Sequence, residues 1–131
     1  MTTISIALLA VMAGCGTASA GMPDADRSFA KGEYQAALSV YSEAAKKPGD
    51  EGLRAAYRAA ECEGLLFRWG EAAQRLSDMK LPPDPLWQGR FLLLRAGTAR
   101  RYLAQYGYAL PSDESKGASD VTKLTAAQWR R

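Results

Sequence analysis

The sequence predicts an all-α protein whose antiparallel helical hairpins stack side by side behind an N-terminal signal segment. Apolar residues recur at helical spacing between residues 24 and 106, and no segment shows the strict alternation of a half-buried strand. Proline and glycine divide this stretch into separate helices. A triad of aromatic, small and large apolar residues also repeats after 35 positions, which is typical of stacked helical hairpins. The triad is Tyr34, Ala37 and Tyr41, and it recurs as Trp69, Ala72 and Leu76.

The first fourteen residues have the properties of a signal peptide. Residues 4–13 are almost all apolar, but about ten residues are too few to span a bilayer, which takes roughly 20. The run ends in Ala13, Gly14 and Cys15, and this ending resembles the lipobox of bacterial lipoproteins. The resemblance implies that residues 1–14 are removed, that Cys15 is lipidated, and that the protein is anchored on the periplasmic side of the cell envelope. Gly16 slightly favours the outer membrane.

Two alternatives for the N-terminus stay open. Residues 18–20, Ala-Ser-Ala, have the form of an ordinary signal-peptidase site, and cleavage there would release a soluble secreted protein. Alternatively, the apolar run forms a buried N-terminal helix. With Cys15 lipidated, residues 15–23 are a tether and Cys62 is the one remaining cysteine. Cys62 lies opposite the apolar stripe of its own helix, so we expect it to pack against a neighbouring helix. A reactive or intermolecular thiol is the alternative.

Caps and breakers delimit the first helices of the predicted domain, residues 24–106. Asp24, next to Pro23, is expected to cap the first helix, and Asp50 the third. Residues 46–49, Lys-Lys-Pro-Gly, end the second helix, and Gly64 is expected to form the turn after the third. The apolar face of the second helix is Tyr34, Ala37, Leu38, Tyr41, Ala44 and Ala45. That of the third is Leu53, Ala56, Tyr57 and Ala60.

Two further helices complete the predicted domain. The fourth presents Leu66, Trp69, Ala72, Ala73, Leu76 and Met79, and the proline-rich residues 81–85 end it. The fifth runs from about 86 to 105 and has two apolar stripes, so it needs neighbours on two sides. The first stripe is Trp87, Phe91, Leu94, Thr98 and Tyr102; the second is Leu92, Leu93, Ala99, Leu103 and Tyr106. Gly107 is expected to cap its C-terminus.

The C-terminal part is predicted to be a polar loop at residues 107–124 and the start of a helix at 125–131. Thr125 and Gln128 have the spacing of a capping box. Because this helix would be less than two turns long, we expect the chain to be the N-terminal fragment of a larger protein. The missing part would cover the second stripe of the fifth helix.

The pattern between residues 24 and 85 resembles the tetratricopeptide repeat family. The residues that carry the resemblance are Gly32, Tyr34, Ala37, Leu38, Tyr41 and Ala44, with Pro48 shortly after. In the second unit, Ala60 stands at the usual Gly position and Phe67 stands where the turn glycine is expected. The resemblance implies stacked hairpins with a concave surface for peptides or partner domains. A generic amphipathic helical bundle is the alternative.

The stretch from Trp87 to Trp129 resembles the helical N-terminal region of some bacterial alpha-2-macroglobulin-like proteins. Those are large exported or lipid-anchored proteins, associated with trapping foreign proteases through a reactive thioester. Their thioester cysteine motif is absent from this sequence, so the resemblance implies a scaffold rather than the trap. It rests on Arg95, Arg100, Arg101, Tyr102, Leu103, Tyr106, Gly107, Tyr108, Pro111, Leu124, Thr125, Gln128 and Trp129.

Composition argues against catalysis. The chain has a net charge of +3 and no histidine, which removes the commonest metal ligand and the commonest general base near neutral pH. The candidate acids are Glu61, Glu63, Asp113, Glu114 and Asp120. Glu61 and Glu63 are two apart on a helix and diverge, and residues 113–120 lack the ligand alternation of a calcium loop.

We therefore predict a non-enzymatic module without cofactor or metal ion. It would bind a protein or peptide partner, or the missing C-terminal part of its own chain, and no nucleic acid. Trp87 and Tyr108 are the expected anchors for that partner. The alternatives are a spacer that holds a larger body off the membrane, and a small enzyme or calcium-binding domain.

Overall fold

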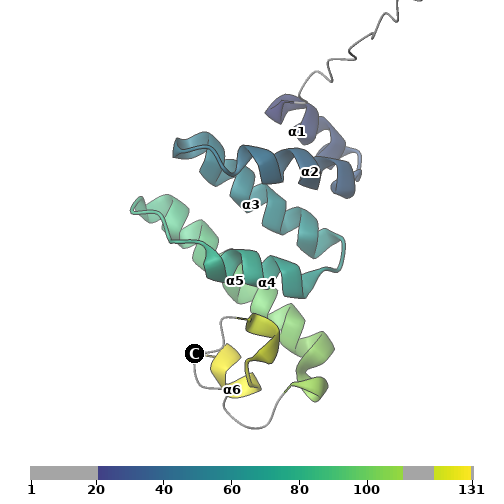
Figure 1. The fold of residues 1–131 in the computed structure, drawn as a ribbon, viewed down its shortest axis with the longest axis vertical. Coiled ribbons are helices and arrows are strands. Elements are labelled where there is room, and N and C mark those ends of the chain that lie inside the picture. Colours follow the sequence, from purple (N-terminus) through teal and green to yellow (C-terminus); the bar gives the residue numbers. More distant parts are fainter. Residues whose placement is uncertain (1–20, 111–119, 131) are drawn as a thin grey trace, which may run out of the picture.

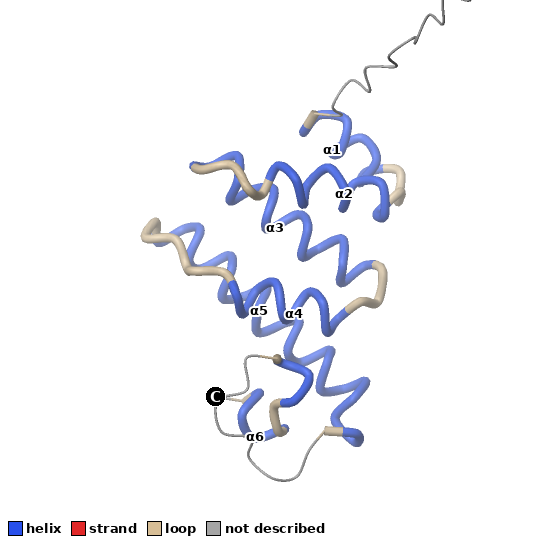
Figure 2. Tube along the Cα trace, viewed as in Figure 1, coloured by secondary structure: helices blue, strands red, loops and turns tan. Residues whose placement is uncertain are grey.

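The structure, a computed structural model, describes residues 21–110 and 120–130. These residues form six α-helices and two short 3-10 helices without a strand, which confirms the predicted all-α class (Figure 2). The predicted signal segment with Cys15, and the loop acids Asp113 and Glu114, lie outside the described residues. Each helix packs mainly against the next one along the chain, and α3 also contacts α5. The helices therefore follow one another along the long axis, from α1 at one end to α6 at the other (Figure 1).

The predicted breakers separate the observed helices. The α-helices are α1 (Met22–Ala30), α2 (Tyr34–Ala44), α3 (Gly49–Leu65), α4 (Trp69–Asp78), α5 (Pro85–Tyr106) and α6 (Ala126–Trp129). The 3-10 helices are η1 (Gly107–Ala109) and η2 (Val121–Lys123). Gly107 is the residue that caps α5, as predicted, although its φ of −56° is right-handed.

Two predicted N-caps are wrong. Gly21 is the N-cap of α1, and Asp24 lies in the first turn, where its carboxylate accepts the Gly21 N–H at 3.4 Å. The N-cap of α3 is Pro48, and Asp50 likewise lies in the first turn of its helix. Both acids keep a favourable position near the positive end of a helix dipole. The side chain of Asp84 does cap α5, accepting the Trp87 N–H at 2.9 Å.

The turn expected at Gly64 is also misplaced. Gly64 is buried inside α3, and a Cβ built on it would come within 2.7 Å of the Trp69 ring. Glycine is needed there because the indole packs against the helix backbone. The chain turns instead at Phe67, whose φ is +60°; among the described residues no other non-glycine residue has a positive φ.

The α1–α2 and α3–α4 turns have the same backbone hydrogen bonds. Gly32, with φ +80°, occupies the position in the first turn that Phe67 occupies in the second, 35 residues later. Both sets of bonds are those of a Schellman turn, which ends a helix with one left-handed residue. In each turn one bond spans five residues: Glu33 N–H to Ser28 O at 2.9 Å, and Arg68 N–H to Glu63 O at 2.8 Å. A second bond spans three residues: Gly32 N–H to Phe29 O and Phe67 N–H to Gly64 O, each at 3.0 Å.

Two apolar clusters form the core. The first lies among α1, α2 and α3 and includes Cys62, whose complete burial confirms its predicted packing and raises its pKa to about 11. The second lies among α3, α4 and α5 and is centred on Ala60, Leu76 and Phe91. The first predicted stripe of α5 is the buried one, since Phe91, Thr98 and Tyr102 all face inward. Ala37 and Ala72 are both inaccessible to solvent.

A buried ion pair connects three successive helices. The carboxylate of Glu63 on α3 accepts bonds from Arg75 on α4, with Nε to both oxygens at 3.0 Å and Nη2 to Oε1 at 2.7 Å. The same guanidinium donates to Ser42 Oγ on α2 at 3.2 Å. Glu63 is almost completely buried, so the pair needs this geometry to offset the cost of removing its charge from water.

The C-terminal helix has the predicted capping box. Thr125 Oγ1 accepts the Gln128 N–H at 3.2 Å, and Gln128 Oε1 accepts the Thr125 N–H at 2.9 Å. Trp129 stacks on Tyr102 of α5, with ring centroids 4.7 Å apart and planes at 22°. Val121 of η2 is buried beside α4 and donates its N–H to Gln74 Oε1 at 2.9 Å. The C-terminal segment, residues 120–130, therefore packs on α4 and α5.

Candidate functional site

A groove runs between α3 and α5. Its centre is a hollow of about 390 Å³, lined by Arg54, Tyr57, Arg58, Glu61, Trp87 and Arg90. A second hollow shares Glu61 and continues past Phe67 to Arg101. A third shares Arg54 and Trp87 and extends to Met22 on α1. We call these three adjoining hollows the α3–α5 groove.

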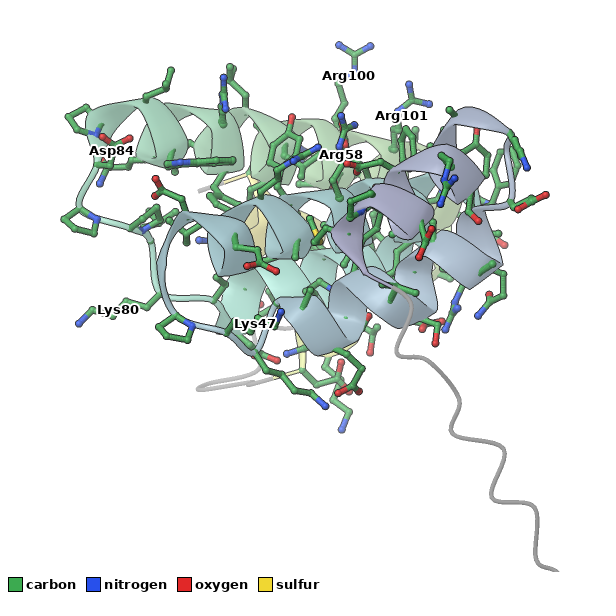
Figure 3. The ribbon with its side chains drawn as sticks, turned by 90° about the horizontal axis from the view of Figure 1, so that it is seen from above. Lys47, Arg58, Lys80, Asp84, Arg100 and Arg101 are labelled. Atoms are coloured by element: carbon green, nitrogen blue, oxygen red, sulfur yellow. The ribbon has the colours of Figure 1, made fainter. Side chains whose placement is uncertain are left out.

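The guanidinium groups of the groove are held in place by rings and acids. Arg58 lies over the Phe29 ring at 4.8 Å and pairs with Glu61 at 2.8 Å. Arg90 lies over Trp87 at 4.9 Å, and Arg101 over Trp69 at 5.2 Å. Such cation–π contacts orient a guanidinium while leaving its N–H groups free to donate. Figure 3 shows Arg58 and Arg101 along the α5 edge of the molecule.

Arg54 differs because an acid on another helix neutralises it. Its guanidinium contacts Asp26 Oδ2 of α1 at 2.6 Å, and Asp26 Oδ1 accepts the Tyr41 hydroxyl at 2.6 Å. Burial, followed by the hydrogen bond to Asp26, raises the pKa of Tyr41 well above its usual value. These bonds through Asp26 fix α1 against α2 and α3, and so shape the end of the groove.

Aromatic rings form the floor of the groove. Tyr57 makes edge contacts with Trp87 and Phe91, at centroid distances of 6.4 and 5.7 Å. Burial, and then the charge of Glu61, raise the pKa of Tyr57, so its hydroxyl stays protonated at neutral pH. Trp87 is half-buried: it belongs to the second core cluster and also lines the groove. Tyr108 is 89% exposed and does not line any of the three hollows.

Phe67 adds an exposed ring at the far end of the groove. Its side chain is 72% exposed and makes an edge contact with Trp69 at 6.3 Å. A left-handed conformation costs a residue with a Cβ roughly 1–2 kcal/mol, so a glycine would be less strained in this turn. The sequence alone showed that Phe67 stands where a turn glycine is expected. It did not show that Phe67 lines a groove, because that depends on the position of α5.

The candidate catalytic acids do not converge. Glu61 pairs with Arg58, whereas Glu63 points to the other side of α3 and pairs with Arg75. The carboxylate of Asp120 accepts the Thr122 hydroxyl and the Thr122 N–H at the start of η2, and these bonds lower its pKa. Residues 21–110 and 120–130 contain no group of three His, Cys, Asp or Glu side chains suited to a metal ion. None of their helices is long and apolar enough to cross a bilayer.

Comparison of the chain with protein-family models, with curated proteins and with solved structures found no match.

Proposed function

We propose that this protein is an exported, lipid-anchored helical-repeat module that binds an acidic, partly apolar segment of another protein in the α3–α5 groove. The observation that carries the proposal is the groove itself, where guanidinium groups held on aromatic faces lie beside exposed apolar side chains. Arg90 and Arg101 have no acidic partner among the described residues, so their charges are available to a ligand.

The tetratricopeptide-like arrangement of the hairpins is part of this proposal. Two turns 35 residues apart make equivalent hydrogen bonds, and the alternate helices α3 and α5 contact each other. Stacked hairpins of this kind present one helix from each unit to a shared surface, which suits an extended ligand. Carboxylates of the ligand would meet Arg90 and Arg101, and its apolar side chains would pack on Phe67 and Leu65.

Binding should therefore depend on acidic residues in the ligand. The probe is an array of synthetic decapeptides rich in Asp, Glu and Phe, with a matched array in which Lys replaces the acids. We expect acidic peptides to be preferred, and the double variant Arg90→Gln/Arg101→Gln to weaken their binding at least about tenfold. The control variant Lys31→Gln/Lys80→Gln removes the same charge from exposed positions outside the groove. Equal losses in both variants, or no preference for acidic peptides, would contradict the groove assignment.

Lipidation at Cys15 is tested separately. The sequence around Cys15 resembles a lipobox, and this resemblance is what supports the proposed anchor. Metabolic labelling with a fatty-acid analogue should mark the unsubstituted chain and the Cys62→Ala variant but not Cys15→Ala. Several acyl chains would be needed, because a single chain binds membranes only marginally. Labelling that persists in Cys15→Ala would exclude this anchor.

A further inference from the structure

Helix α5 differs from the other long helices in its charge. Its 22 residues include four arginines and no Asp or Glu. All four arginines are exposed, and none forms an ion pair with another described residue. Arg90 and Arg101 line the α3–α5 groove, and Arg95 lines a hollow against α4 and residues 121–130, whereas Arg100 lines none of these. Figure 3 shows Arg100 extending outward from α5, away from the rest of the molecule.

The side of α5 that faces away from the core is apolar. Leu86 is 62% exposed and Leu93, one heptad later on the same face, is 77% exposed. Leu92 is exposed too, but it lines a hollow that α5 forms with α4 and residues 121–130. A Cβ added at Gly89 or Gly97 would meet nothing within 4 Å, so this side of the helix is open. We call Leu86, Leu93 and Arg100, which follow one another at seven-residue intervals, the α5 outer face.

We propose that the α5 outer face lies on the surface of a bilayer containing anionic phospholipids. Exposed leucines together with arginines that lack acidic partners are the pattern of a helix lying in a membrane interface, where the leucines enter the acyl boundary. The long side chain of Arg100, on the same helix face as the two leucines, can reach the phosphate groups. The charge of the helix matches anionic lipid, and it opposes docking of a second copy through the same face, which would bring two clusters of positive charge together.

This contact goes beyond peptide binding in the groove and does not require the lipid on Cys15. A helix of this length spans about 33 Å, which is enough to orient the protein when it lies flat. Arg90 and Arg101 remain on the groove side of α5. The membrane and the peptide would therefore use different arginines of one helix, and the two proposals can fail separately.

A fluorescent label tests the orientation directly. The full chain carrying Cys15→Ala retains only Cys62, which is buried, so a cysteine introduced on the surface can be labelled alone. We would attach an environment-sensitive NBD group at Leu93→Cys or, as the control, at Lys31→Cys on the exposed end of α1. With vesicles of phosphatidylcholine and phosphatidylglycerol at 7:3, the label at 93 should shift to the blue and brighten at least about twofold. The label at 31 should change little, and so should both labels with pure phosphatidylcholine.

Co-sedimentation with the same vesicles measures the contribution of charge. Relative to the Cys15→Ala chain, Arg100→Gln should lower the partition coefficient about fivefold, and Leu93→Ser should also lower it. The matched controls are Lys31→Gln and Leu65→Ser, which change exposed residues elsewhere. Raising the salt concentration should weaken the binding, since the attraction is screened.

Three outcomes would overturn the proposal. The first is equal partitioning into the neutral and anionic vesicles. The second is an equal blue shift at positions 31 and 93, which would mean that residues 1–20 or another face carries the membrane contact. The third is the absence of a blue shift together with sedimentation that depends on protein concentration and is altered by Leu93→Ser, which would assign the face to a second copy.

Discussion

The α1–α2 and α3–α4 hairpins make the same turn with different side chains. In the first, Phe29 and Tyr34 fill the space between the helices, with ring centroids 5.4 Å apart. In the second, the equivalent positions hold Gly64 and Trp69, and the larger indole occupies the space that glycine leaves. The two hairpins thus fill the equivalent space with different residue types. The Gly32 and Phe67 positions also differ, since a relaxed turn glycine is replaced by a strained, exposed ring. We interpret that exchange as a sign of binding, because packing does not require it.

The hairpins also differ in how they are connected to their neighbours. Ser28 of α1 bonds only to the exposed Glu33, at 3.0 Å, whereas its equivalent Glu63 forms the buried ion pair with Arg75. The residue equivalent to Arg75 is Val40. The second hairpin thus has an ion pair at positions where the first has none, whereas the first is joined to α3 by the more exposed Asp26–Arg54 pair.

Removing the Glu63–Arg75 ion pair should produce the largest difference in stability loss between the two hairpins. Glu63→Ala leaves the Arg75 charge without its partner and should lower the free energy of unfolding by about 3–5 kcal/mol. Ser28→Ala should cost less than about 1 kcal/mol, because its hydrogen bond is exposed. Urea unfolding followed by far-UV circular dichroism measures both. Similar losses at the two positions would mean that the ion pair contributes little.

The small residues at the helix contacts should behave alike in the two hairpins. Ala37→Leu and Ala72→Leu should each cost about 1–3 kcal/mol, because both side chains are completely buried against a neighbouring helix. Ala36→Leu is the matched control, since Ala36 is exposed on α2. Thermal melting measures all three variants. If only one of the two buried alanines is sensitive, the contacts are not equivalent.

Exchanging the turn residues should give effects of opposite sign. Phe67→Gly relieves the left-handed strain and should stabilise the fold by up to about 1 kcal/mol, whereas Gly32→Ala introduces the strain and should destabilise it by about the same amount. Phe67→Gly should also weaken acidic-peptide binding, because it removes the exposed ring of the groove. A variant that loses stability instead would show that the contact of Phe67 with Trp69 outweighs the strain.

The smallest effect concerns Cys62, whose equivalent in the first hairpin is the exposed Arg27. Burial raises the pKa of Cys62 from 9.0 to about 11, so between these pH values the unfolded thiol ionises while the folded one keeps its proton. The folded state then binds more protons, and stability should fall as the pH rises through this window, by on the order of 1 kcal/mol. Below pH 9 the group contributes nothing to the pH dependence.

Urea unfolding at pH 8.5 and pH 10 measures this decline. The Cys62→Ala variant should lose less stability between the two pH values than the unsubstituted chain. An unchanged decline would assign the effect to other groups, such as the buried tyrosines.

Local patterns predicted the helices but not the contacts that modify their ends. The stripes on α2 and α5 are periodic over several turns, so the buried sides of Tyr41 and Phe91 followed from spacing alone. Asp24 and Asp50 were mistaken for caps because an acid is favourable at the cap and also in the first turn. Gly64 was assigned to a turn because its reason for being glycine, the Trp69 ring, appears only after folding.

The candidate groove was less predictable than the fold. Trp87 was singled out from the sequence, but Arg54, Arg58 and Arg90 were not, because they come from helices separated by more than twenty residues. The charge of α5, by contrast, was present in the sequence as a 28-residue acid-free run from 85 to 112. Averaging the charge over the whole chain conceals that run.

The buried Glu63 carboxylate has a consequence for the order in which the chain opens. Because the Arg75 guanidinium of α4 bonds both to this carboxylate on α3 and to Ser42 on α2, none of the three helices can separate from the others without breaking a bond of Arg75. We expect α2, α3 and α4 to exchange their amide hydrogens as one cooperative unit, while α1 and the C-terminal segment exchange at lower cost. The α3 side of the groove would then stay folded while α1 and the C-terminal segment open locally. One side of the binding site would therefore be preformed for a ligand.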